Sequence, residues 1–212
     1  MEIHAPDHSI TSWKDTVKHL AIITAGVLIA LVLEGVVAWV DHRLLVREAV
    51  ANLTSEVRAN RKELDGMFAN LEKEQSEFQH ADEIALKLLA REKLDHISLS
   101  LNFGSPELKN AAVTTGQITG AFGYMDYSEV RRYADVYDMQ AQFMRLQERQ
   151  GQAFEAVFAF VRRFADATPP APEALERWRS QIDVALSGLY IREQMGRQLL
   201  KRYDELLATT SH

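Results

Sequence analysis

An acidic residue, Glu34, is the single ionisable residue in an apolar run of 21 residues from Leu20 to Val40. A carboxylate at the centre of a membrane helix costs about 2.5 to 3.5 kcal/mol and usually has a partner. Small residues recur every four positions and share one helix face with this carboxylate: Gly26, Ala30 and Ala38. Because small side chains let a second helix approach closely, we expect this face to be an interface. The alternative is that Glu34 extends to the lipid headgroups on its own.

Glu77 and His80 are a second pair of residues that could carry chemistry, because they form an E-x-x-H motif on a predicted helix. Di-iron bundles use this motif twice, together with two further glutamates. A second copy is missing here, and the other histidines are scattered along the chain. We therefore expect ordinary surface charge at these positions, with no metal and no cofactor.

Three glycines, Gly116, Gly120 and Gly123, do not have the spacing of a phosphate-binding loop. We expect them to allow a turn or close packing between helices. The alternative for this stretch is a small-molecule pocket with four lining residues: Phe122, Tyr124, Met125 and Tyr127. No Ser-His-Asp or paired-carboxylate arrangement stands out above chance, so we expect a protein that is not an enzyme.

The elements that position these residues begin with the apolar run over 20–40, whose helix would be about 31 Å long, close to the hydrocarbon thickness of a bilayer. A signal peptide has a shorter apolar core and a basic start, and soluble helices are rarely apolar all round. Trp39 fits an interfacial anchor at the far end. The sequence therefore predicts a tail over 1–19, one transmembrane helix over 20–40 and a helical domain over 41–212.

The chain carries 24 Lys and Arg against 30 Asp and Glu, a net charge of −6, and no cysteine. An acidic surface of mixed sign does not attract phosphate backbones, so we expect no nucleic-acid partner. The basic residues nearest the run are balanced, two before it and two after it. Those further on (Arg58, Arg61 and Lys62) favour a cytoplasmic domain, with the periplasmic side as the alternative.

Apolar residues after the run recur with heptad spacing, which predicts a long helix with a coiled-coil-like seam. One row contains Val50, Val57, Leu64, Leu71, Phe78 and Ala85, and the partner row contains Leu53, Met67, Ala81 and Leu88. Asn60 and Glu74 interrupt the seam. Because no Gly or Pro separates Val40 from Leu64, we expect the membrane helix to continue into this one without a joint.

Loop residues follow, and Ser105 is expected to cap a short helix that starts at Pro106. A second long helix is predicted after Asp126, with a core supplied mainly by four aromatic residues: Tyr133, Tyr137, Phe154 and Phe158. The TPPAP run at 168–172 ends it, and a last helix begins near Glu173.

Further polar residues occupy predicted seam positions: Gln140, Gln147 and Arg192. With Asn60 and Glu74, they either face one another inside the bundle or lie at ends that face solvent. The predicted fold class is all-α, with one N-terminal transmembrane helix continuing into an antiparallel bundle of three long helices and one short helix.

Three stretches carry a resemblance: GVLIAL at Gly26 to Leu31 followed by LEGVVAWVDHR, TTGQITGAFGYMDYSEV, and RRYADVYDMQ. They resemble a group of uncharacterised bacterial single-pass membrane proteins with an N-terminal span and a helical C-terminal domain. The resemblance implies this architecture and a place in the bacterial inner membrane, and it brings no catalytic residues.

The sequence favours a membrane-anchored interaction or scaffolding module, self-associating or acting as an accessory subunit of a larger membrane complex. Its partners would be the lipid bilayer and either a second copy or another membrane protein. The alternative function is a small-molecule-sensing bundle that signals through a separate partner.

Overall fold

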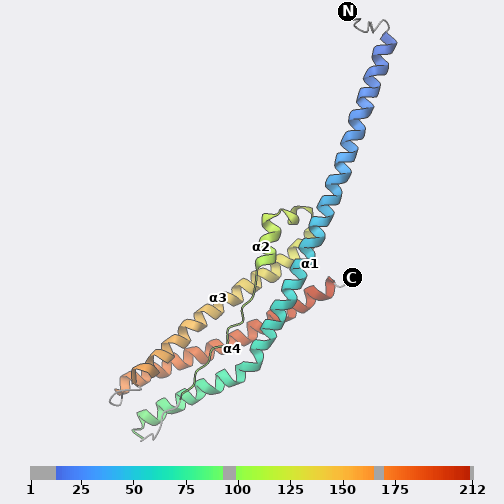
Figure 1. Cartoon of the computed structure of the whole chain (residues 1–212). Helices are drawn as coiled ribbons and strands as arrows, with labels where there is room; N and C mark the ends of the chain where they lie inside the picture. The colour runs from blue at the N-terminus through green and yellow to red at the C-terminus, as the bar shows by residue number, and fades with distance from the viewer. Residues whose placement is uncertain (1–12, 93–98, 165–169, 211–212) are drawn as a thin grey trace, which may run out of the picture. The chain divides into compact units, whose positions relative to one another are not determined.

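The computed structural model describes residues 13–92, 99–164 and 170–210. Its contacts divide the chain into an N-terminal unit, Met1–Glu48, and a C-terminal unit, Ala49–His212. The helices are α1 (Trp13–Leu89), α2 (Ala111–Ile118), the short 3-10 helix η1 (Ala121–Tyr124), α3 (Tyr127–Phe164) and α4 (Pro172–Thr209), as Figure 1 shows. The described residues form no strand, which confirms the predicted all-α class.

The N-terminal unit contains the apolar run as part of α1, which continues without a break to Leu89. The predicted continuation of the apolar helix into the next one is therefore confirmed. Within the described ranges, α1 is the one helix that is long and apolar enough to cross a membrane. No residue of its most apolar stretch is buried against another part of the protein.

The core of the C-terminal unit follows the predicted seams of α1 and α4. Leu53, Val57 and Leu64 on α1 are fully buried, and so are Ile182 and Leu199 on α4. The long sequence patterns thus predicted correctly which helix faces are turned inward.

The aromatic core of α3 differs in part from the prediction. Tyr133 and Tyr137 are buried as expected, whereas Phe158 is 41% exposed, so its expected place in the core is wrong. Phe143, from a neighbouring row of α3, is fully buried. The Trp178 ring of α4 is also buried, and its indole N–H donates to the carbonyl of Val157 at 3.1 Å.

Side-chain contacts give the order of the long helices within the C-terminal unit. Hydrogen bonds that join α1 to α3 include those of Thr54 with Tyr133 and of Asn60 with Gln140. Ion pairs that join α1 to α4 include Arg61 with Asp204 and Asp82 with Arg179. The paired residue numbers rise together for α1 and α3, and they run in opposite order for α1 and α4. Helices α3 and α4 lie side by side (Figure 1).

Because α1 and α3 run in the same order, the chain must return between them, and residues 99–110 make the described part of this return without helix. The expected helix start at Pro106 is wrong, since α2 begins at Ala111. A helix starting at Pro106 would need the Lys109 N–H for its first turn, but this N–H is already bound to the side chain of Asn60 on α1. The Ser105 hydroxyl contacts Gln147 and does not cap a helix.

Candidate functional site

The buried polar residues of the C-terminal unit gather around the non-helical return segment, residues 99–110. Five of them, here called the clamp, are Asn60, Glu74, Gln140, Gln147 and Arg192, each at most 4% exposed. All five come from seam positions of α1, α3 and α4. Of the two predicted alternatives, the structure shows the first, in which these residues face inward.

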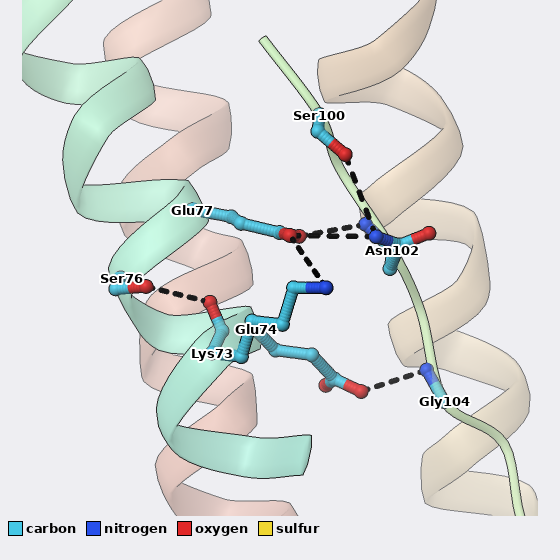
Figure 2. Close-up of polar contacts among 7 residues, drawn as sticks. All are labelled: Lys73, Glu74, Ser76, Glu77, Ser100, Asn102 and Gly104. Atoms are coloured by element: carbon cyan, nitrogen blue, oxygen red, sulfur yellow. Dashed lines mark hydrogen bonds and ion pairs between the residues drawn. The ribbon is translucent and has the colours of Figure 1, made fainter.

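The Gly104 end of the clamp contains a buried ion pair. The Gly104 N–H donates to Glu74 Oε1 at 2.7 Å, as Figure 2 shows, and Arg192 Nη1 donates to the Gly104 carbonyl at 3.3 Å. Glu74 Oε2 accepts a hydrogen bond from Arg192 Nη2, which makes them an ion pair. Both side chains are at most 3% exposed. The two charges therefore neutralise each other while they satisfy the N–H and the carbonyl of one glycine.

The absence of a side chain at Gly104 is part of this geometry. A Cβ added there would lie 2.8 Å from Glu74 Oε1, closer than real Cβ contacts allow. A Cβ there would push the Glu74 carboxylate away from its contacts with Arg192, so glycine leaves room for the backbone to approach this carboxylate.

At the Lys109 end, Asn60 contacts both polar groups of one residue. Its Nδ2 donates to the Lys109 carbonyl at 2.7 Å, and its Oδ1 accepts from the Lys109 N–H at 2.8 Å. Gln140 Nε2 donates to the same carbonyl at 2.8 Å, and Tyr203 donates to Gln140 Oε1 at 2.7 Å. These two amide side chains therefore satisfy both backbone polar groups of Lys109.

Between the two ends, Gln147 donates to the Pro106 carbonyl at 3.1 Å. Burial lowers the pKa of the Arg192 guanidinium from its ordinary value, and the charge of Glu74 opposes this effect. The guanidinium also lies 4.9 Å from the centre of the Phe103 ring, a cation–π distance. Arg192 Nε and Gln147 Oε1 are the buried side-chain atoms of the described residues that have no hydrogen-bond partner.

Glu77 and His80 do not lie together as metal ligands. Glu77 accepts from the backbone N–H of Asn102 at 2.8 Å, with Lys73 Nζ at 3.9 Å (Figure 2). His80 is more than half exposed and lies 3.7 Å from Glu83. In the parts of the chain that the structure describes, no group of three or more His, Cys, Asp or Glu is arranged to hold a metal ion.

One residue that the sequence analysis missed is Glu56. Its carboxylate accepts from Tyr137 at 2.7 Å and from the backbone N–H of Ala112 at 2.9 Å, so it joins α1 to α3 and to the first turn of α2. Burial and this carboxylate raise the pKa of Tyr137 far above its ordinary value. Burial is also the main cause of the raised pKa of Tyr203. Glu56 immediately precedes Val57 of the apolar row, so in the sequence it looks like an ordinary surface glutamate and gives no signal of its role.

A cavity of about 650 Å³ lies between the α2 region and α3. Its apolar lining includes Leu108, Val113, Phe122, Val130 and Met144. Phe122 is the one residue of the expected pocket that lines this cavity. The remaining three lie elsewhere: Met125 is buried, Tyr124 is 53% exposed and Tyr127 is 80% exposed.

The glycines of this region act as predicted at two positions. Gly120 adopts a left-handed conformation with φ of 73° and makes the turn between α2 and η1. A Cβ at Gly116 would lie 2.7 Å from the Phe122 ring, so this glycine allows close packing. A Cβ at Gly123 would meet nothing within 4 Å, and no packing reason for that glycine is visible.

The expected interface residues of the N-terminal unit all lie on α1 (Gly26, Ala30, Glu34 and Ala38). The first three are exposed and Ala38 is half-buried. Neither a family model, nor a curated protein, nor a solved structure matches the chain.

Proposed function

We propose that the protein is a membrane-anchored helical interaction module, which self-associates or serves as an accessory subunit of a larger membrane complex. One observation carries this proposal. The apolar stretch of α1 is long enough to span a bilayer, and no described part of the protein covers it. Such a surface needs lipid or another apolar helix around it, because contiguous exposed apolar area of this size is unfavourable in water.

The contact between copies or subunits would use the α1 face with Gly26, Ala30, Glu34 and Ala38. A second helix packed on this face would shield Glu34 from the lipid. The span would confine the C-terminal unit to the membrane surface, so that a weak contact of that unit adds to the helix contact through effective concentration.

The C-terminal unit would act as a rigid platform. We propose that α4 runs antiparallel to α1 and α3 in a bundle, with α2 as the short fourth helix. The pairings of Arg61 with Asp204 and of Asp82 with Arg179 support the opposite direction of α4. The clamp supports rigidity, because it ties the return segment to all three long helices.

The resemblance to bacterial single-pass membrane proteins supports a place in the bacterial inner membrane. The downstream basic residues Arg58, Arg61 and Lys62 favour a cytoplasmic C-terminal unit, with the periplasm as the alternative. A topology reporter fused after His212 tests this assignment.

The test of the interface is crosslinking of the full chain in lipid nanodiscs or native membranes, with and without Ala30→Leu and Ala38→Leu. The matched control carries Ala21→Leu and Ala25→Leu, which lie about 180° around the helix from that face. We expect the first pair to abolish the crosslinked species and the control to retain them. A strictly monomeric protein without co-purifying partners, or equal loss in both variants, would contradict the proposal.

A second function is favoured by the cavity between the α2 region and α3. Its volume of about 650 Å³ falls within the range of small-molecule sites. If the protein senses a solute there, thermal-shift screening yields a stabilising compound whose effect disappears in Ala141→Phe, which fills the cavity. Tyr124→Ala, outside the cavity lining, would leave that effect unchanged.

A further inference from the structure

Residues 111–127, here called the cap, contain α2, η1 and the first residue of α3. The cap exposes three large side chains with apolar surface. Ile118 is 81% exposed, Tyr127 is 80% exposed and Tyr124 is 53% exposed. Ala121 in the same stretch is fully buried, so the cap is packed on the rest of the unit. Exposure of this size on a packed element indicates a contact surface.

The cap lies at the end of the C-terminal unit where α1 enters it. Ala112 N donates to Glu56 at 2.9 Å, and Tyr133 bonds to Thr54 at 3.1 Å. Residue numbers rise together in α1 and α3, so Tyr127 lies six residues, about 9 Å, from Tyr133 toward lower numbers of α1. Tyr127 is therefore level with the first residues of the unit, near Ala49.

The chain connects this level to the apolar run by a short piece of α1. About eight residues follow Val40 before that level is reached, which amounts to about 12 Å of helix. The headgroup layer extends about 5 to 7 Å beyond the hydrocarbon on each side. Membrane helices tilt by about 20° on average, and a tyrosine side chain adds several ångströms of reach. Tyrosine is also enriched at membrane interfaces.

We propose that the cap docks on the headgroup layer of the membrane that anchors the chain, with Ile118 and Tyr127 in the interface. This inference rests on the proposed membrane anchor. The contact is apolar and does not depend on anionic lipid, because Asp126 lies between the exposed tyrosines. Hydrogen bonds from Ser128 lower the pKa of Asp126, which keeps this carboxylate charged.

The test uses the full chain, which contains no cysteine and so accepts single labels cleanly. Ile118→Cys and Tyr127→Cys, each carrying a nitroxide, are reconstituted in phosphatidylcholine vesicles. The measurement compares two collision rates of the nitroxide label. One is the rate with oxygen, which concentrates in lipid, and the other is the rate with a water-soluble nickel chelate. The reference is Val184→Cys on α4, whose native side chain is 59% exposed.

We expect the oxygen-to-nickel collision ratio at positions 118 and 127 to exceed the ratio at 184 severalfold. Equal ratios at the three positions would overturn the proposal. Low collision with both reagents would also overturn it, because the cap would then be covered by protein. Val32→Cys within the apolar run reports on the anchor separately. A high oxygen-to-nickel ratio at position 32 with a low ratio at position 127 would reject the docking of the cap but not the membrane anchor. A low ratio at position 32 would reject the membrane anchor.

Discussion

Replacing the buried ion pair of the clamp by methionine gives a quantitative test of the structure. Glu74→Met leaves the Arg192 charge buried and unpaired, and Arg192→Met does the same to Glu74. Breaking a buried pair in this way costs about 3 to 5 kcal/mol, a large part of the 5 to 15 kcal/mol that stabilises a typical domain. We expect each single variant to be destabilised by about this amount.

The double variant removes both charges and leaves the Gly104 N–H and carbonyl without their partners. Each unsatisfied backbone group costs about 1 to 3 kcal/mol, so the double variant should lose about 2 to 6 kcal/mol. The two single losses sum to about 6 to 10 kcal/mol. The expected coupling energy is therefore about 4 kcal/mol, taken from the middle of these ranges.

The assay is urea unfolding of the full chain in mild detergent, followed by far-ultraviolet circular dichroism. The control is the corresponding set of two single methionine variants and one double variant at Arg61 and Asp204. This ion pair has a distance of 2.5 Å, and its side chains are 38% and 51% exposed. Exposed pairs contribute about 0.2 to 1 kcal/mol. Additive losses at Glu74 and Arg192, or a coupling energy no larger than that of the control, would refute the account of the clamp.

Three further predictions concern single positions. Gly104→Ala should lower the free energy of unfolding by about 1 to 3 kcal/mol, because the new Cβ meets Glu74 Oε1. Gly66→Ala, which has open space around it in α1, should raise the free energy of unfolding by about 0.5 to 1 kcal/mol. Urea unfolding of the two variants measures both changes. Gly116→Ala should destabilise by about 1 to 3 kcal/mol through the Phe122 ring, and Gly123→Ala should not; faster hydrogen exchange in α2 of the first variant alone is the readout. The pKa of Tyr137 is raised in the folded state, so its stabilising contribution is complete below pH 10 and is lost above it, by about 1.4 kcal/mol per pH unit. Tyr137→Phe should make the fall in stability above pH 10 shallower, and the exposed Tyr190→Phe should leave it as it is; equal slopes in both variants would contradict the assignment.

The sequence predicted the parts of the fold that depend on local periodicity. Helix type, the inward faces of α1 and α4, and the unbroken continuation of the apolar helix all follow from spacing within one helix. It also marked Asn60 and Glu74 as polar interruptions of an apolar seam. Those interruptions were the strongest available signal for the clamp.

The partners of the clamp could not be predicted, because they are set by the tertiary path of the return segment. Nothing in the local pattern shows that Gly104 and Lys109 meet side chains of α1. A non-helical segment packed against helices must have its buried backbone groups satisfied, and polar side chains from distant parts of the chain can do so. The sequence of the segment itself then carries no signal of these partners. The expected helix start at Pro106 was wrong for this reason. Glu56 was missed because its partners also come from distant elements.

The long separations between paired residues set the order in which the C-terminal unit can fold. Trp178 and Val157 are 21 residues apart, whereas Thr54 and Tyr133 are 79 apart and Glu74 and Arg192 are 118 apart. Contacts between near neighbours in the chain form fastest, so we expect α3 and α4 to close on each other before α1 joins them. Synthesis produces the elements in the opposite order, and about 120 residues must be added after Leu89 before α4 is complete. At roughly 5 to 20 residues per second this takes about 6 to 24 s. Until then the apolar seam of α1 lacks α4, one of its two native helical partners in the C-terminal unit, and part of its apolar surface stays uncovered.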